Sequence, residues 1–186
     1  MLISKFLNCN VESKVANLEK KYKITLPSQY KTFLHKYNGG YTPKTKFKTG
    51  KLSSDIQAFF GIGDVILSLD TIDLDEWLQK KLFPIACDSF GNHIVISLHN
   101  ESMGNIYFCD HENGNMTTYI TENLNDFFAY CKSEKISEAS RRTIKEREEI
   151  LIAKGKGNII TDDLRRMWQT EIDKYRNMVQ EEVSLD

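Results

Sequence analysis

The chain has 186 residues, of which 40% are hydrophobic and 27% are charged, with a formal net charge of −1. This composition is typical of a globular protein with a sizeable core and excludes a disordered chain. No apolar run approaches the roughly 18 residues that a membrane helix needs, so we expect no membrane-spanning segment.

The four cysteines indicate a reduced, cytoplasmic protein. They stand at positions 9, 87, 109 and 131, without the close pairs typical of zinc knuckles or disulfide frameworks. The first residues, MLISKFLNCN, have too short an apolar run for a signal peptide and lack a small-residue cleavage site. We therefore expect a cytoplasmic location, buried thiols, and neither a metal ion nor a cofactor.

Two amphipathic helices are predicted at the start of the chain. Asn10 is a candidate N-cap for the first, and Pro27 suits the first turn of the second because its missing N–H is not needed there. Gly39 or Gly40 can take the left-handed conformation that ends the second helix. The apolar positions at helical spacing are Val11, Val15, Leu18, Tyr22, Tyr30, Phe33, Leu34 and Tyr37.

The middle of the chain predicts β structure. Residues 41–55 are basic and polar and are expected to form a long loop or an edge hairpin, followed by a short buried strand. A helix is expected in residues 68–82, before Pro84. Short runs of alternating residues, separated by turns, follow: FPIAC, HIVISLH, IYFCD and MTTYI. This succession indicates a meander of antiparallel strands.

The last part of the chain predicts helices. Thr121 is a candidate N-cap for one helix, the charged residues 134–154 form another, and Thr161 caps a last helix with a strong apolar face. We therefore expect an α+β fold in which helices pack on an antiparallel β-meander sheet. The expected domains are an α+β domain in residues 1–132 and a C-terminal helical extension in residues 133–186 that packs on it.

The small net charge conceals a strong asymmetry along the chain. Residues 1–51 carry eleven lysines and two acidic residues, whereas residues 52–131 carry two lysines and twelve acidic residues. Segments that are separate in the sequence come together in the folded protein, so this asymmetry of charge can simply reflect ordinary solvent-exposed faces. Alternatively, the middle of the chain presents an acidic surface, which would steer a basic partner towards it.

The stretch PIACDSFGNHIVISL contains residues that resemble catalytic groups. Cys87, Asp88, Ser89 and His93 can form a Cys–His pair or a Ser–His–Asp set on paper, but catalytic partners meet in space and sequence proximity says little. Cys87 lies in an apolar run, where a thiol is usually inert, and DSFGN is good turn sequence. We therefore expect no catalytic residue here and predict that the protein is not an enzyme.

Three kinds of ligand are weighed and disfavoured. His99, Asp110, His111 and Glu112 converge on a metal only if two strands pair with all ligands on one face, whereas DHENGN is favourable turn sequence. GIGD lacks the spacing of a nucleotide-binding loop. The lysines of residues 14–51, interleaved with Tyr and Phe, allow a basic groove, but a sequence pI near 6.4 argues against nucleic acid as the partner.

Six features in a fixed order carry a family resemblance, an opening helix and then five short sequence words: LPSQYKTFLHKYNGG, FFGIGD, LFPIACDSFGNHIVISL, GNIYFCDHE and ITENLNDFFAYC. In this respect the chain resembles the SUKH superfamily, the Smi/Knr-type domain, over about residues 10–132. The resemblance implies an α+β fold and, for bacterial members, an immunity protein that neutralises a cognate polymorphic toxin, often a nuclease. Fungal members imply the alternative, a regulatory module that acts through protein contacts.

The resemblance implies that the partner is a protein toxin. This protein would neutralise it by occluding its active site, without catalysing a reaction itself, and a homodimer is also possible. An inhibitor of a nuclease must present negative charge to a site built for phosphates. Trp77 is either an aromatic anchor of that contact or a core residue. The candidate partner-binding residues are Asp64, Asp73, Asp75, Glu76, Asp88, Asn92, Asp110 and Glu112.

Overall fold

The computed structural model describes residues 1–6 and 10–185. It divides the chain into two compact units, one made of Met1–Glu134 with Gln180–Asp186 and the other of Lys135–Val179. No helix among the described residues is both long enough and apolar enough to cross a bilayer.

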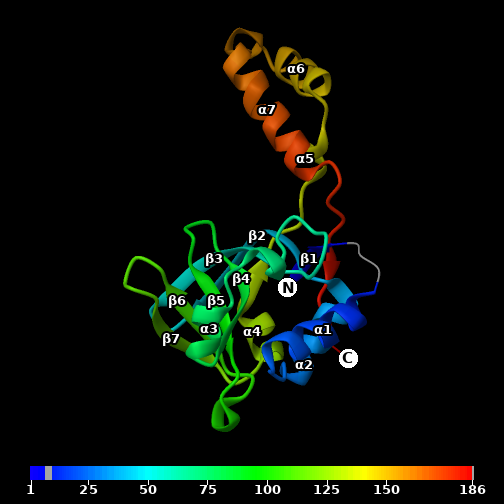
Figure 1. The fold of residues 1–186 in the computed structure, drawn as a ribbon. Helices are drawn as coiled ribbons and strands as arrows, with labels where there is room; N and C mark the ends of the chain where they lie inside the picture. Colours follow the sequence, from blue (N-terminus) through cyan, green and yellow to red (C-terminus); the bar gives the residue numbers. More distant parts are fainter. Residues whose placement is uncertain (7–9, 186) are drawn as a thin grey trace. The chain divides into compact units, whose positions relative to one another are not determined.

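The first unit is built on one antiparallel sheet, whose strands can be followed in Figure 1. Its order is β7-β6-β5-β4-β3-β2-β1-β9, with β8 paired to β2. The predicted meander forms the β4 to β7 half of this order, which confirms the α+β fold class. The strands are β1 (Leu2–Lys5), β2 (Gly40–Thr49), β3 (Leu52–Phe59), β4 (Leu82–Cys87), β5 (His93–Ser97), β6 (Ile106–Asp110), β7 (Met116–Thr121), β8 (Cys131–Ser133) and β9 (Glu181–Glu182).

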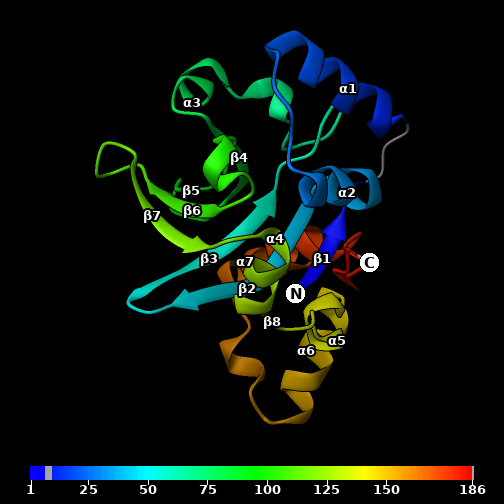
Figure 2. The same cartoon turned by 90° about the horizontal axis from the view of Figure 1, so that it is seen from below.

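Helices cover the two faces of this sheet unequally. α1 (Val11–Tyr22), α2 (Ser28–Tyr37) and α4 (Leu124–Tyr130) contribute to the main core, together with strand residues such as Ile94 and Ile96. Figure 2 shows α1 and α2 next to one another. Val95, which lies between Ile94 and Ile96 in β5, points to the opposite face of the sheet and packs with Trp77 of α3 (Asp75–Gln79) and with Cys109. Because successive strand residues point to opposite faces, α3 covers the second face.

Two helix ends differ from the predictions. Asn10 precedes α1, but it has a left-handed φ of 62° and its side chain makes no capping hydrogen bond. Asn123, not Thr121, caps α4 by accepting a hydrogen bond from Asp126 N; Thr121 is the last residue of β7. The strand therefore continues up to the turn, and the helix begins at the first side chain that can reach its free N–H groups.

Residues 41–55 form a long hairpin, as one of the two predictions had it, but the hairpin lies inside the sheet and not at its edge. β2 lies between β3 on one side and β1 and β8 on the other. Phe47 is buried, whereas its neighbours Lys46 and Lys48 are exposed. This period of two is the pattern of a strand with one solvated face, and the many lysines obscure it.

The second unit, residues 135–179, is helical. It contains α5 (Glu138–Arg141), α6 (Ile144–Ala153) and α7 (Asp162–Tyr175), and Thr161 caps α7 as predicted. Arg147 of α6 pairs with Glu171 of α7 at 2.8 Å. After this unit the chain returns to the sheet, where Leu2 and Ile3 of β1 face Glu182 and Glu181 of β9. The expected C-terminal extension therefore includes a segment that belongs to the first unit.

Candidate functional site

The turn between β4 and β5 is organised by a buried carboxylate. Asp88 is only 2% exposed. Its Oδ1 accepts hydrogen bonds from Phe90 N (2.9 Å) and Asn92 N (2.8 Å), and its Oδ2 accepts from Ser54 Oγ (2.7 Å) and Asn92 Nδ2 (2.8 Å). All of these bonds stabilise the turn or attach it to β3. The carboxylate of Asp88 therefore serves the fold and does not face solvent.

Asn92 connects this turn to the next one. Its side-chain oxygen accepts a hydrogen bond from His111 N at 3.1 Å, and His111 Nδ1 lies 2.8 Å from the same oxygen. In the β6–β7 turn, Asp110 accepts from Asn113 Nδ2 and from Glu112 N. These bonds, led by that from Asn113, lower the pKa of Asp110. Glu112 is exposed, so this turn presents both carboxylates on a fixed backbone.

Three further predicted residues lie at α3. Asp73 precedes this helix and accepts a hydrogen bond from Asp75 N at 3.1 Å. Glu76 pairs with Lys80 at 2.9 Å, which lowers the pKa of Glu76, and a hydrogen bond from Asn115 lowers it further. Because Asn115 belongs to the β6–β7 turn, that turn and α3 lie close together.

We call the five exposed or half-exposed carboxylates of α3 and the β6–β7 turn the acidic surface: Asp73, Asp75, Glu76, Asp110 and Glu112. Burial raises the pKa of the buried Cys109 thiol; the charge of Lys80 lowers it, and the charges of Asp110 and Glu76, one from each element, raise it. Asp64 is exposed in a different loop, which follows β3. The structure therefore brings most of the predicted acidic residues to neighbouring elements but leaves Asp64 outside.

Trp77 is a core residue. It is 9% exposed, packs against Val95 and Cys109, and has its ring centroid 5.2 Å from that of His93. It therefore anchors α3 to the sheet, while Asp75 and Glu76 beside it face solvent.

The residues that resembled a catalytic set are not arranged as one. Cys87 and His93 face each other across the β4–β5 ladder, but burial, followed by the nearby Asp88 charge, raises the pKa of Cys87 to about 11. A thiol with such a pKa is protonated at neutral pH and is a poor nucleophile. Burial lowers the pKa of His93. The hydrogen bonds of the described residues do not connect Ser89 to His93; Ser89 N donates to Asp55.

The structure does not bring His99, Asp110, His111 and Glu112 together as a set of metal ligands. Over residues 1–6 and 10–185, no three His, Cys, Asp or Glu side chains are grouped as metal ligands would be. His111 is directed to Asn92 and Asp110 to Asn113, so both are used by their turns.

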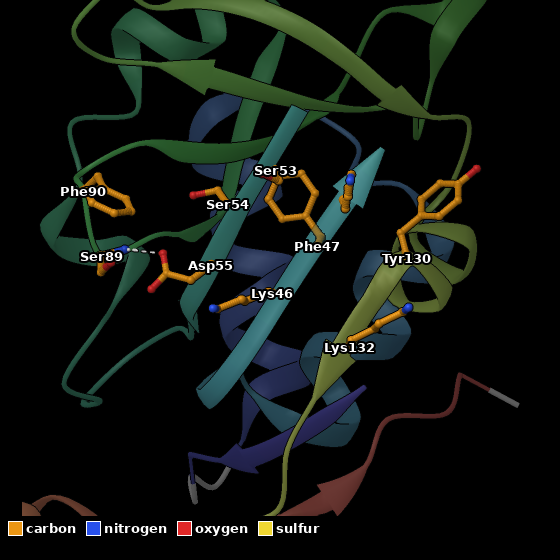
Figure 3. Close-up of a pocket in the computed structure, with 10 residues that line it drawn as sticks. Lys46, Phe47, Ser53, Ser54, Asp55, Ser89, Phe90, Tyr130 and Lys132 are labelled. Atoms are coloured by element: carbon orange, nitrogen blue, oxygen red, sulfur yellow. Dashed lines mark hydrogen bonds between the residues drawn. The ribbon is translucent and has the colours of Figure 1, made fainter. Parts of the chain in front are cut away.

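A hollow of about 660 Å³ lies over the β2–β3 hairpin, and sequence analysis missed it. Figure 3 shows Phe90 on one side of the hairpin and Tyr130 and Lys132 on the other. Cross-strand pairing places Lys46 opposite both Asp55 and Lys132. The alternating lysines of residues 44–48 were the feature of the sequence that could have indicated this hollow. Lys132, which completes it, is far away in the sequence. The lining residues are Lys46, Phe47, Lys48, Ser53, Ser54, Asp55, Ser89, Phe90, Tyr130 and Lys132.

Comparison with known proteins agrees with this architecture. The family model described as SUKH, SMI1-KNR4 cell-wall, matches residues 12–128, which is more than half of the chain. The SPbeta prophage-derived uncharacterized protein YokK of Bacillus subtilis (strain 168) is 28% identical over 130 residues. That match covers 58% of this chain and 66% of the relative, just under two thirds of its length. The matched region runs from α1 through the acidic surface to α4, and the chain belongs to the SUKH (SMI1-KNR4) family.

Proposed function

We propose that this protein is an immunity protein that binds a cognate polymorphic toxin in the cytoplasm and neutralises it by occlusion. SUKH domains are generally immunity or interaction modules, and the relative in a prophage is compatible with this role. The observation that carries the proposal is the acidic surface on α3 and the β6–β7 turn. Two of its carboxylates, those of Asp73 and Asp110, accept backbone hydrogen bonds, Glu76 is paired with Lys80, and all five are exposed or half-exposed.

The mechanism follows from charge complementarity. A nuclease-type toxin domain binds phosphates with basic residues, and a surface of fixed carboxylates competes for the same residues. Such a surface also steers association, so that complex formation is fast at low salt. The protein performs no chemistry in this mechanism, in keeping with the protonated thiol of Cys87.

The second candidate is a regulatory interaction module without a toxin. The family description, SMI1-KNR4 cell-wall, favours this candidate. The two functions predict different partners: a toxin domain encoded beside this gene, or a housekeeping protein captured from the cell.

Co-expression of the adjacent toxin domain with this protein tests the first candidate. We expect growth to be rescued and a complex to be isolated; a complex containing two copies of this chain would show the homodimer that we consider possible. Absence of both rescue and complex would reject the immunity function.

Charge reversal tests the surface separately. Changing Asp73, Asp75 and Glu76 to Lys should slow association with a basic toxin domain about tenfold or more and weaken its salt dependence. The matched control reverses three exposed carboxylates outside the acidic surface: Glu12, Glu101 and Glu122. If both triple variants associate at the wild-type rate, the acidic surface is not the interface.

A further inference from the structure

The hollow over the β2–β3 hairpin contains an unfavourable pairing of like charges. Lys46 and Lys132 are directly opposite one another in the β2–β8 ladder. Like charges in this position destabilise a sheet, because their side chains project from the same face. This arrangement does not stabilise the fold, whereas an anion bound between the two ammonium groups would interact favourably with both of them.

Among the lining residues, three lysines outnumber a single carboxylate, that of Asp55, which faces Lys46 across the β2–β3 ladder. In the described part of the chain, Lys46, Lys48 and Lys132 take part in no ion pair. Asp55 is the carboxylate among the lining residues, and its Oδ1 accepts a hydrogen bond from Ser89 N at 3.1 Å. The hollow therefore keeps a positive charge that is available to a ligand.

Two exposed aromatic rings flank these lysines. Phe90 is 69% exposed and Tyr130 is 43% exposed. Phe90 is placed at the tip of the β4–β5 turn, which the buried carboxylate of Asp88 holds through four hydrogen bonds. An apolar side chain on a preorganised turn loses little further conformational freedom when a partner covers it. Such rings are the usual anchors of protein interfaces.

From these observations we infer that the hollow is a docking site for an acidic segment of a protein partner. Carboxylates of the segment lie between Lys46, Lys48 and Lys132, and an apolar side chain between them packs against Phe90 and Tyr130. The volume of about 660 Å³ accommodates a few side chains. The sequence pI near 6.4 favours a peptide over a nucleic acid as the occupant. This site is opposite in charge to the acidic surface and does not depend on a toxin being the partner.

A synthetic peptide tests the inference on the full chain. The probe is a fluorescein-labelled pentapeptide with a central phenylalanine and two acidic residues on each side. We expect saturable binding, with amide shifts in NMR spectra concentrated at Lys46, Phe90 and Lys132. A peptide with lysines in place of the acidic residues should not bind. The absence of saturable shifts at these amides at about 1 mM acidic peptide would overturn the inference.

Variants separate this site from general charge effects. K46E/K132E should weaken peptide binding about tenfold or more, F90A about tenfold, and the α1 surface variant K20E less than about twofold. In addition, K132T should raise the unfolding midpoint of the free protein while weakening binding, because it removes the like-charge pair. Equal losses in K20E and K46E/K132E would contradict the site. So would tighter, lysine-dependent binding of an oligothymidylate, which would make the occupant a nucleic acid.

Discussion

Replacing Asp88 with Ala should destabilise the first unit strongly, although this residue lies in a surface turn. Its carboxylate is 2% exposed and accepts four hydrogen bonds of 2.7–2.9 Å, from Ser54, Phe90 and twice from Asn92. A hydrogen bond to a charged group contributes about 1.5–3 kcal/mol, but bonds within one network are not additive. Because water can reach part of the opened turn, we expect a loss of about 3–4 kcal/mol, a large share of a typical domain's stability.

Urea unfolding measures this loss. Trp77 packs against the sheet in the first unit, so its fluorescence reports that unit once Trp168 of the second unit has been changed to Phe. With an m-value of about 2 kcal/mol per M, the midpoint should fall by about 1.5–2 M. The control Glu112→Ala removes an exposed carboxylate and should change stability by less than about 0.5 kcal/mol.

An exchange of the two partners provides a stricter test. D88N places an amide donor against the donor Asn92 Nδ2, and N92D places a second carboxylate beside Asp88. The double variant D88N/N92D restores one donor and one acceptor, and Asp at position 92 still accepts from His111 N. We expect it to be more stable than the sum of the single changes by about 1–3 kcal/mol. A loss below about 1 kcal/mol for D88A, or strict additivity in the exchange, would refute the account of the turn.

Three shorter predictions concern single residues. Tyr30→Phe should raise the free energy of unfolding by about 1 kcal/mol, because the buried Tyr30 hydroxyl has no hydrogen-bond partner among the described residues; a lower free energy of unfolding would contradict this. Burial lowers the pKa of His93 below 6.5, so the neutral side chain stabilises the fold above that pH and this contribution is lost as the pH falls. The urea midpoints measured at pH 7.5 and at pH 5 should therefore differ less in His93→Gln than in the wild type or in the control His35→Gln. Gly39→Ala should prevent folding or lower the free energy of unfolding by more than about 3 kcal/mol, because φ is +75° and the new Cβ would lie 2.6 Å from backbone atoms. The control Gly50→Ala, which has open space around it, should cost about 1 kcal/mol, and thermal denaturation measures both.

The spacing of apolar residues along the chain predicted those helices and strands whose buried faces follow from their own sequence. Residues 28–37 have apolar side chains at helical spacing and form α2, and the alternation of Ile94, Val95 and Ile96 matches the two faces of β5. By contrast, β9 has two residues and no measurable period, so its pairing with β1 was not predictable. Its position depends on a contact between the two ends of the chain.

The candidate site shows the same limit. Turn chemistry predicted the turn at DSFGN, which the structure shows, since Asp, Gly and Asn suit a tight turn. The burial of Asp88, however, depends on Ser54, which lies 34 positions earlier. The hollow likewise combines Lys46 with Lys132, whose proximity follows from the β2–β8 register alone. Spacing along the chain contains no information on that register.

The return of the chain to β1 implies that the second unit is an insertion that can be removed. The ends of the first unit meet where Gln180 Nε2 donates to Glu134 O at 3.2 Å, so a Gly-Ser linker of about four residues can replace residues 135–179. We expect this shortened chain to fold with a cooperative thermal transition. A chain that simply stops at Glu134 also loses β9 and the hydrogen bond from Ser184 N to Tyr37 Oη (2.9 Å), and should be less stable by about 2–4 kcal/mol. Equal stability of the two shortened chains would show that the C-terminal residues contribute nothing to the sheet. An unfolded linker chain would show that the sheet depends on the second unit.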